Sequence, residues 1–544
     1  MARFLAALLA GAAVCFRGLS WNFSTAEAAH PAQPESRKGG ARKRLRLRAQ
    51  QRKPKVTHPR VITKQITSSR SAAEVLEVVR SEQANPRLDF IALSAAWARI
   101  AKLPKAPEML ADPFLPELIQ LTRQWVRRSK VSGKAQHNAR AVAQTFWAVA
   151  KLDRYLSLHL TDLRKSLATA AKHTARHTDA QGVANMIWAT AKLADRSSTC
   201  DAELRAPLGA LARRVEEVSD EMSPQGVENV IWATAKLAEQ GDTTLMDLLP
   251  TLAAQVQERR WDLDAQAVAS VVWSTAKLAD EGDGCLAPLL PMLAVRCKAL
   301  KGELTAQGAA NVAWAAAKLL DYEDDSLLVA LPDLAGRVRE VRNEMTGQGI
   351  ANLMWAAAKV AEHGEESLLS ALPALALRVE AMKATYSAQE VANLIWAVAK
   401  LSDFCDDSLL ALLPILAARV EELRLDLSAQ GLANIIWATA KLADAEDAEP
   451  LLSLLPALAS REELRSEMTA QAVENILWAS ARLAELGDFS LGPLLPGLSA
   501  RVKELRPELD EDGVANILWA ISKLSEHGDD SLRGLVPVLV GSET

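Results

Sequence analysis

The residues best suited to bind a ligand recur at one fixed spacing along the chain. Counted from a repeated tryptophan, glutamine lies at position −7, asparagine at −3 and lysine at +4, as in Gln348, Asn352, Trp355 and Lys359. Amide side chains hydrogen-bond to base edges, cations contact phosphates, and tryptophan rings stack on bases. These residue types therefore fit the binding of a single-stranded nucleic acid better than they fit covalent chemistry.

We predict that the asparagines and cations of this pattern form a binding stripe. On an α-helix the positions −7, −3, 0 and +4 fall within about 60° of arc, so one helix presents them on one face. The predicted binding residues are Asn185, Lys192, Asn229, Lys236, Lys277, Asn311, Lys318, Asn352, Lys359, Asn393, Lys400, Asn434, Lys441, Asn475, Arg482, Asn516 and Lys523.

Each residue type in the stripe also has a structural interpretation. Tryptophan is large and apolar, so packing between repeats is its default role. Asparagine and glutamine can bridge neighbouring helices through hydrogen bonds. Lysine stands in the last helical turn, where a cation also satisfies the helix dipole and the terminal carbonyls. Duplication copies core and binding residues alike, so the repetition does not decide between these roles.

Patterns for catalysis are missing from the sequence. Histidine occurs only 8 times, and no HExxH, CxxC, GxSxG or phosphate-loop motif occurs. The glycines of the repeats stand singly near predicted helix starts, as Gly308 and Gly349 do, so they cannot form a glycine-rich phosphate loop. We therefore predict a protein that is not an enzyme, with no catalytic residue, metal or cofactor.

The tryptophan pattern is an internal repeat. Of 14 tryptophans, eleven belong to it, and every spacing from Trp232 onward is 41 residues. A fixed period of this size is typical of a solenoid built from stacked helical units. We predict an all-α, right-handed α-solenoid of about ten to eleven two-helix repeats. The repeated residues are Trp97, Trp147, Trp188, Trp232, Trp273, Trp314, Trp355, Trp396, Trp437, Trp478 and Trp519.

Two helices are expected in each repeat. Helix A is typified by Ala306–Leu319, with Thr305 as its N-cap. Its Val, Ile and Leu residues at −5, −2, −1 and +5 are expected to form the core. An acidic loop and a Leu/Ala-rich helix B follow. A proline 18 residues after most of the tryptophans, as at Pro414, either starts the main part of helix B or kinks it.

Helix B carries a second recurring cation, an arginine near its end. Glutamates are interspersed with these arginines, and a helix end of mixed charge is expected to be a solvated face rather than a binding stripe. The arginines are Arg296, Arg337, Arg378, Arg419, Arg461 and Arg501.

The formal net charge of −4 hides two different segments. Residues 1–70 carry 15 Lys and Arg against Glu27 and Glu35, which gives +13 and leaves −17 for the rest. A short apolar run at residues 4–16 and an acid-free basic stretch at 37–70 are typical of organelle targeting. We predict a leader and basic arm at 1–70, a capping repeat region at 71–135 and the repeat array at 136–544. The mitochondrial matrix is favoured, a plastid is the alternative location, and no membrane association is expected of the mature form.

The helix A motif resembles that of octotricopeptide-type repeat proteins. The segments Gln348–Val360 (QGIANLMWAAAKV) and Gln181–Leu193 (QGVANMIWATAKL) carry the likeness. They also resemble FAST-kinase-like leucine-rich repeats and the repeat domain of an RNA-editing substrate-binding complex subunit. The resemblance implies an organellar α-solenoid that binds RNA in processing, stability or translation. The unit here is longer than the octotricopeptide name denotes. Because residue 544 lies inside a repeat, the nuclease-like RAP domain of many relatives is not expected.

The partner expected from these observations is single-stranded RNA, together with other proteins of an organellar ribonucleoprotein complex. The stripe is nearly uniform, whereas a base-reading code needs side chains that differ between repeats, so generic binding fits better. The alternative is an armadillo-like protein-interaction scaffold that holds an extended basic peptide. The charge of −17 on the repeats is compatible with that second class, because affinity for nucleic acid depends largely on phosphate neutralisation.

Overall fold

The computed structural model describes residues 57–103, 112–129, 135–194, 202–404, 407–445 and 448–540. The predicted leader and most of the basic arm lie outside these residues. The described chain divides into two compact units, residues 57–289 and 290–540, and each is treated by itself below. The boundary between them falls inside the stretch that the sequence predicts as one array, and the predicted domain limits stay predictions.

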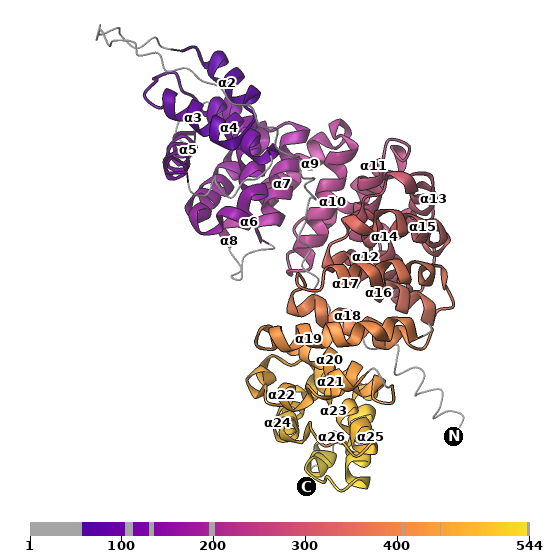
Figure 1. Cartoon of the computed structure of the whole chain (residues 1–544). Coiled ribbons are helices and arrows are strands. Elements are labelled where there is room, and N and C mark those ends of the chain that lie inside the picture. Colours follow the sequence, from indigo (N-terminus) through magenta and orange to yellow (C-terminus); the bar gives the residue numbers. More distant parts are fainter. Residues whose placement is uncertain are drawn as a thin grey trace, which may run out of the picture. The chain divides into compact units, whose positions relative to one another are not determined.

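The N-terminal unit consists of helices joined by short connections (Figure 1). Its α-helices are α2 (Pro59–Ser68), α3 (Ala72–Glu82), α4 (Phe90–Lys102), α5 (Leu115–Ser129), α6 (Ala135–Thr174), α7 (Ala180–Ala194), α8 (Ala202–Arg205), α9 (Leu208–Val218), α10 (Pro224–Ala238), α11 (Leu249–Glu258) and α12 (Ala265–Asp280).

The C-terminal unit repeats one helical pair along its length. Its α-helices are α13 (Leu290–Ala299), α14 (Ala306–Leu319), α15 (Leu331–Val341), α16 (Gly347–Glu362), α17 (Leu372–Ala381), α18 (Ala388–Leu401), α19 (Leu413–Leu423), α20 (Ala429–Leu442), α21 (Glu449–Leu452), α22 (Leu455–Ala459), α23 (Ala470–Glu485), α24 (Leu495–Leu505), α25 (Glu511–Glu526) and α26 (Val536–Val540).

The prediction of an all-α helical-repeat fold is confirmed. Across the described ranges the regular elements are α-helices and short 3₁₀ helices, without a strand. Within each unit every A helix packs against the next one, as α7 does on α10 and α14 on α16. None of the helices in the described part of the chain has the length and apolar character needed to cross a membrane.

Helix A begins through a local signal that recurs in most repeats, and in five repeats it ends at a glycine. At its start, a Ser, Thr or Asp side chain accepts a hydrogen bond from a backbone N–H three residues later, as Thr305 does from Gly308. At its end, a glycine with positive φ terminates the helix, as Gly364 does after α16 at φ 82°. The prolines lie at the first or second position of helix B, for example Pro332 in α15. They therefore start the main helix B segment, which decides between the two predicted roles.

The repeat that contains Trp147 departs from the predicted pair of helices. Here α6 runs unbroken for 40 residues, from Ala135 to Thr174. Five repeats have a glycine of positive φ and an acidic residue after helix A, whereas this one has Leu156 and Ser157. Leucine is a good helix former and does not favour the left-handed backbone that ends those five helices, which is consistent with the continued helix.

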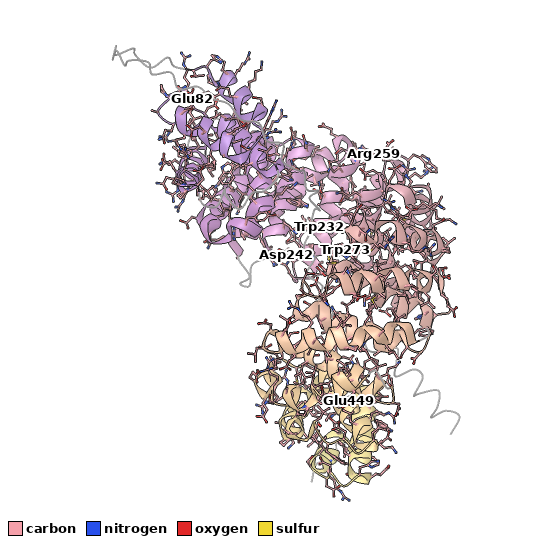
Figure 2. The ribbon with its side chains drawn as sticks, in the orientation of Figure 1. Glu82, Trp232, Asp242, Arg259, Trp273 and Glu449 are labelled. Atoms are coloured by element: carbon pink, nitrogen blue, oxygen red, sulfur yellow. The ribbon has the colours of Figure 1, made fainter. Side chains whose placement is uncertain are left out.

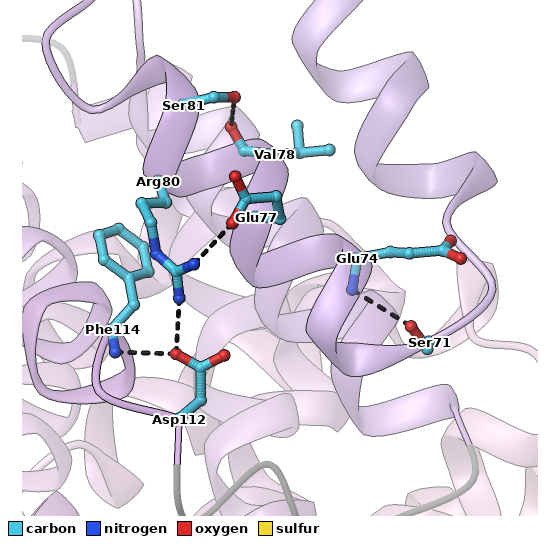
Figure 3. A network of polar contacts seen from close by, with 8 residues as sticks. All are labelled: Ser71, Glu74, Glu77, Val78, Arg80, Ser81, Asp112 and Phe114. Carbon is cyan, nitrogen blue, oxygen red and sulfur yellow. Dashed lines mark hydrogen bonds and ion pairs between the residues drawn. The ribbon is translucent and has the colours of Figure 1, made fainter. Parts of the chain in front are cut away.

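Charged side chains also join elements at the start of the N-terminal unit (Figure 3). Arg80 of α3 bridges Glu77 at 2.6 Å and Asp112 at 2.8 Å, and its guanidinium lies 5.3 Å from the centre of the Phe114 ring. Asp112 in turn accepts a hydrogen bond from the backbone N–H of Phe114. This network fixes the chain just before α5 against α3.

Candidate binding face of the A helices

Several of the repeated tryptophans lie against a tryptophan of a neighbouring A helix. Ring centres are 6.1 Å apart for Trp188 and Trp232 and 6.4 Å apart for Trp314 and Trp355, with the planes tilted by 32°. The same contact recurs between Trp437 and its neighbours Trp396 and Trp478. Figure 2 labels Trp232 and Trp273, on the adjacent helices α10 and α12. The tryptophans thus form ladders in register, so the A helices of a unit run parallel.

The repeated tryptophans pack in the interior of the repeats. Trp97, Trp273, Trp314, Trp355 and Trp396 are buried, with at most 6% of each side chain exposed. The other six, Trp147, Trp188, Trp232, Trp437, Trp478 and Trp519, are half-buried. The expected Val, Ile and Leu core is present on the same helices, for example at Ile350 and Val360. The five buried rings have no open face on which a base could stack.

The predicted stripe residues are far less exposed than the sequence suggests. Nine of them are buried to 8% exposure or less: Lys236, Lys277, Lys318, Asn352, Lys359, Asn393, Lys400, Asn434 and Asn475. Another seven are half-buried: Asn185, Lys192, Asn229, Asn311, Lys441, Arg482 and Lys523. Asn516 is exposed. The expectation of an open stripe is wrong for the first group, because neighbouring A helices pack directly over it.

The cations form ion pairs that cross from one repeat to the next. Lys277 Nζ lies 2.7 Å from Glu239, Lys400 Nζ lies 2.8 Å from Glu362, and Arg482 contacts Asp444 at 2.6 Å. In each case the acid stands seven residues after the tryptophan of the preceding repeat. Lys441 and Lys523 make the same contact to Asp403 and Glu485.

Several of these acids hold two cations. Glu239 pairs with Lys236 of its own helix as well as with Lys277 of the next, and the Lys236 ammonium also lies 5.3 Å from the ring centre of Trp273. Charge neutralisation, cation–π contact and burial therefore coincide on one row. The lysines are locked between repeats, which limits what they can offer to an external phosphate.

The acids at position +7 are the functional partners that sequence reasoning missed. The available signal was their recurrence, since every repeat from Trp232 onward carries Asp or Glu at that position. They are Glu239, Asp280, Asp321, Glu362, Asp403, Asp444, Glu485 and Glu526. Counted only as part of an acidic loop, they gave no hint that six of them would meet the cation of the next A helix.

The asparagines and glutamines of helix A differ in exposure. Asn434 accepts a hydrogen bond from the Gln430 side chain at 2.8 Å, and Gln471 donates to Asn475 in the same way at 3.3 Å. The glutamines themselves reach the surface, because they lie in the first helical turn. Gln181, Gln225, Gln266, Gln307 and Gln389 are exposed.

The first turn of helix A is also free of acids in most repeats. No Asp or Glu occurs in the first turn of α7, α10, α12, α14, α16, α20 or α23. Acidic side chains are usually stabilising at that position, because it is the positive end of the helix dipole. The first turns of these helices carry glutamine and no acidic residue, although Asp179 and Asp264 cap α7 and α12; the helices with Ser or Thr caps have the setting that suits an anionic ligand.

The arginines of helix B act as struts inside each repeat. Arg337 Nε donates a hydrogen bond of 2.8 Å to the backbone carbonyl of Leu304, just before helix A of the same repeat. Arg501 and Arg419 reach the carbonyls of Met468 and Tyr386 in the same way. A glutamate three residues later, such as Glu340, pairs with the same guanidinium at the surface. This arrangement agrees with the expectation of a face that is not a binding stripe.

Two glutamates, Glu228 buried and Glu474 half-buried, interrupt the otherwise uniform A-helix row. Burial raises the pKa of the Glu228 carboxyl to about 7; a hydrogen bond from Ser270 lowers it in part, and Asp264 raises it further. Burial likewise raises the pKa of Glu474 to about 7, opposed by a hydrogen bond from Asn516. Both occupy position −4, where neighbouring repeats have alanine.

Comparison with known proteins gives no family. No protein-family model and no curated protein matches the sequence. Among known structures, the chain is similar to one in a homology model of the full-length AP-3 complex in an intermediate open conformation. The identity is 13% over 89% of this chain and 85% of that one, with a TM-score of 0.28. So low a TM-score has no bearing on function, and the fold assignment rests on the helices described above. No set of three or more His, Cys, Asp or Glu in the described ranges is arranged to hold a metal ion.

Proposed function

We propose that this chain is a non-catalytic helical-repeat protein that binds single-stranded RNA in an organelle. The observation that carries the proposal is the row of A-helix first turns without acidic residues, each bearing a glutamine, most of them exposed. Backbone N–H groups at such turns are suited to contact phosphates, and glutamine amides can hydrogen-bond to bases or ribose. The resemblance of the helix A motif to organellar RNA-binding repeats supports the same class.

The predicted stripe residues contribute to this surface where they remain accessible. Asn516 is exposed, and Asn185, Lys192 and Asn229 are half-buried on helices whose first-turn glutamine, where present, is exposed. The remaining lysines serve mainly to hold successive repeats together. Because the cations are neutralised by +7 acids, we expect moderate affinity with a weak dependence on salt.

Binding to RNA is tested by titrating the full chain with a fluorescein-labelled uridine oligonucleotide at two salt concentrations. The combined variant Gln225→Ala and Gln307→Ala removes two exposed amides from the acid-free first turns of α10 and α14, and is expected to weaken binding at least about tenfold, or 1.4 kcal/mol. Gln257→Ala is the matched control, because Gln257 is an exposed glutamine on a B helix, α11. Equal affinities for all three proteins would exclude the N-terminal row as the RNA site.

The role of the lysines is tested separately without changing net charge. The pair Lys400→Met and Glu362→Gln removes both members of one ion pair. Unchanged RNA affinity would assign Lys400 to structure, and a marked loss would return the lysine row to the binding site.

A protein-interaction scaffold is the second candidate, favoured by the neutralised lysine row. A surface that does not present free cations, on repeats of net charge −17, suits a basic peptide better than it suits a polyanion. Failure of the oligonucleotide titration at low salt would favour this class.

The organellar location is proposed from the composition of the N-terminal segment. Its 15 cations and two acids are typical of a targeting sequence. A fluorescent fusion of residues 1–70 is expected to enter mitochondria, with a plastid as the alternative. A cytosolic fusion would contradict both.

A further inference from the structure

One face of α25 is left uncovered by the described part of the chain. On every A helix the positions −8, −4, −1, +3 and +7 from the tryptophan lie on one face, which we call the stacking stripe, because their spacing follows the helical turn. In α25 the stacking stripe consists of Glu511, Ala515, Leu518, Ser522 and Glu526. Leu518 is half-buried, and the other four residues are exposed.

The middle of the stacking stripe is buried in the preceding repeats. The residues at −1 are 0% exposed in four successive A helices: Met354, Ile395, Ile436 and Leu477. The residues at +3 are at most 1% exposed in the same helices: Ala358, Ala399, Ala440 and Ala481. In each case the next A helix covers the stripe, so α25 presents a surface that these repeats use as an interface.

Each end of the stacking stripe meets a particular residue of the next A helix. At the −4 end the helices approach closely, and a Cβ on Gly431 would lie 3.5 Å from Cβ of Ala392 in the preceding helix. At the +7 end an acid pairs with a cation, as Glu362 does with Lys400 at 2.8 Å. The interface therefore matches small residues at one end and opposite charges at the other.

On α25 both ends of the stripe are ready for such a helix. Ala515 is small, as Ala392 is. Glu526 has 54% of its side chain exposed and contacts Lys523 of its own helix at 2.9 Å, but no cation of another helix in the described ranges. Glu511 would lie beside the N-terminal end of a parallel helix, where the helix dipole favours a carboxylate. The charges of the stripe thus complement a parallel helix that carries a cation near its C-terminal end.

The first A helix of the chain, in contrast, is already covered. In the N-terminal unit α2 packs on α4 and buries Ile62 and Ile66, each 0% exposed. The other side of α2 carries exposed polar residues such as Lys64 and Ser68. A polar outer face is typical of a capping element in a solenoid. A second copy of this chain could not offer α4 to the stripe of α25 unless α2 moved away, so we expect a different protein there.

We propose that the stacking stripe of α25 binds the first A-type helix of another helical-repeat protein. The bound helix runs parallel to α25, with glycine or alanine opposite Ala515 and lysine or arginine opposite Glu526. The contact continues the stacking that joins α20 to α23 and α23 to α25. RNA is disfavoured, because its phosphates would meet Glu511 and Glu526. The stripe contains none of the first-turn glutamines, so this proposal is independent of the proposed RNA binding.

The test uses the full chain and a fluorescein-labelled synthetic peptide with the sequence of residues 346–386, followed by fluorescence anisotropy. This peptide is one repeat and carries Gly349 and Lys359 at the two contact positions. Ala515→Arg puts a long cationic side chain into the stripe and should weaken binding about tenfold or more. Ala418→Arg is the matched control, because Ala418 is an exposed alanine on α19, and this variant should bind like the original chain.

The charge requirement is tested by a swap. Glu526→Lys should weaken binding of the original peptide, and the change Lys359→Glu in the peptide should restore binding to the Glu526→Lys chain. Both altered positions of the chain are exposed, so the variants should fold, which circular dichroism checks.

Several results would overturn the proposal. They are the absence of peptide binding to the original chain, equal binding by the Ala515→Arg chain, and a charge swap that does not restore binding. A dimer of the original chain in sedimentation that Ala515→Arg abolishes would assign the stripe to a second copy instead. Loss of uridine oligonucleotide binding by Ala515→Arg, with peptide binding unchanged, would make the stripe an RNA site.

Discussion

Lys359 Nζ lies 2.9 Å from one carboxylate oxygen of Asp321, whose other oxygen is 3.1 Å from Lys318 Nζ. The two lysines belong to successive A helices and their side chains are only 6% and 9% exposed. One acid thus neutralises two buried ammonium groups and ties two repeats together. The row that suggested phosphate binding is, at these positions, an inter-repeat clasp.

Removing this acid should cost more stability than removing either lysine. Asp321→Asn leaves Lys318 and Lys359 buried without a counter-charge, and we expect a loss of about 2–4 kcal/mol in the free energy of unfolding. Lys359→Met replaces a buried cation by an apolar side chain and should cost less. Urea denaturation followed by circular dichroism measures both.

Asp325→Asn provides the control for Asp321→Asn, because Asp325 is an exposed acid of the same loop. Its effect should stay within about 0.5 kcal/mol. Equal losses for the two variants would show that the clasp is not what stabilises the junction.

The missing side chain of Gly347 leaves room for the ring of Tyr386. Tyr386 is 1% exposed and occupies a position where neighbouring repeats have leucine or methionine. A Cβ on Gly347 would lie 2.7 Å from the tyrosine ring. Gly347→Ala should therefore lower stability by about 1–3 kcal/mol despite the better helix propensity of alanine.

Two further variants separate this clash from a general effect of alanine. Gly349→Ala, where a Cβ would make only ordinary contacts of 3.5 Å or more, should be neutral or stabilising. Adding Tyr386→Leu to Gly347→Ala should restore most of the loss. The double-mutant cycle by thermal unfolding would refute the pairing if the two effects simply add.

The sequence predicted what is local and periodic, and missed what depends on neighbouring repeats. Trp355, Thr305 and Pro332 have their expected roles in packing, capping and helix initiation, because each role depends on spacing along one or two helices. The burial of Lys359 depends on an acid 38 residues earlier, in another repeat. Periodicity puts both residues on helical faces but does not show that the two faces meet.

The same limit applies to α6 and to the short helix α22. The repeat pattern predicts a break after every A helix, yet α6 runs unbroken through that point. A one-residue shift near Arg461 leaves the period of 41 intact, so the period alone conceals the broken helix. Departures from the average repeat, rather than the repeat itself, locate these features.

Trp355 should be a stability residue. Its side chain is 3% exposed and its ring packs on Trp314. Trp355→Ala is expected to reduce the free energy of unfolding by about 3–5 kcal/mol. Trp261→Ala is the control, since Trp261 is 64% exposed and lies outside the ladder, and should cost less than about 1 kcal/mol. A mild effect of Trp355→Ala on unfolding, with lost RNA binding, would identify a stacking platform instead.

Glu323 adopts a left-handed backbone conformation at a position where several other repeats have glycine. Its φ is +60°, whereas Gly241, Gly282 and Gly364 take positive φ at the equivalent position. A side chain in the left-handed region costs about 1 kcal/mol. Glu323→Gly should therefore raise stability by about 0.5–1 kcal/mol, measured by thermal unfolding. Glu340→Gly, within helix α15, should have the opposite sign.

Glu228 should make stability depend on pH in a defined direction. Burial raises the pKa of its carboxyl from 4.5 to about 7, so the folded state holds the proton more tightly than the unfolded chain does. The stability contributed by this proton is fully present below about pH 4.5. It is lost as the pH rises through 7, and the slope is therefore negative between those values. The groups facing it, Ser270 and Asp264, come from the neighbouring repeat.

Glu228→Gln keeps the shape of the side chain and removes the titration. Above pH 7 the variant should be more stable than the original chain by on the order of 1–3 kcal/mol, and the advantage should vanish below about pH 4.5. Urea titrations at several pH values measure the difference, which isolates Glu228 from other groups such as Glu474. A constant difference across the pH range would contradict the raised pKa, because it would show that Glu228 has the same pKa in the folded and unfolded states.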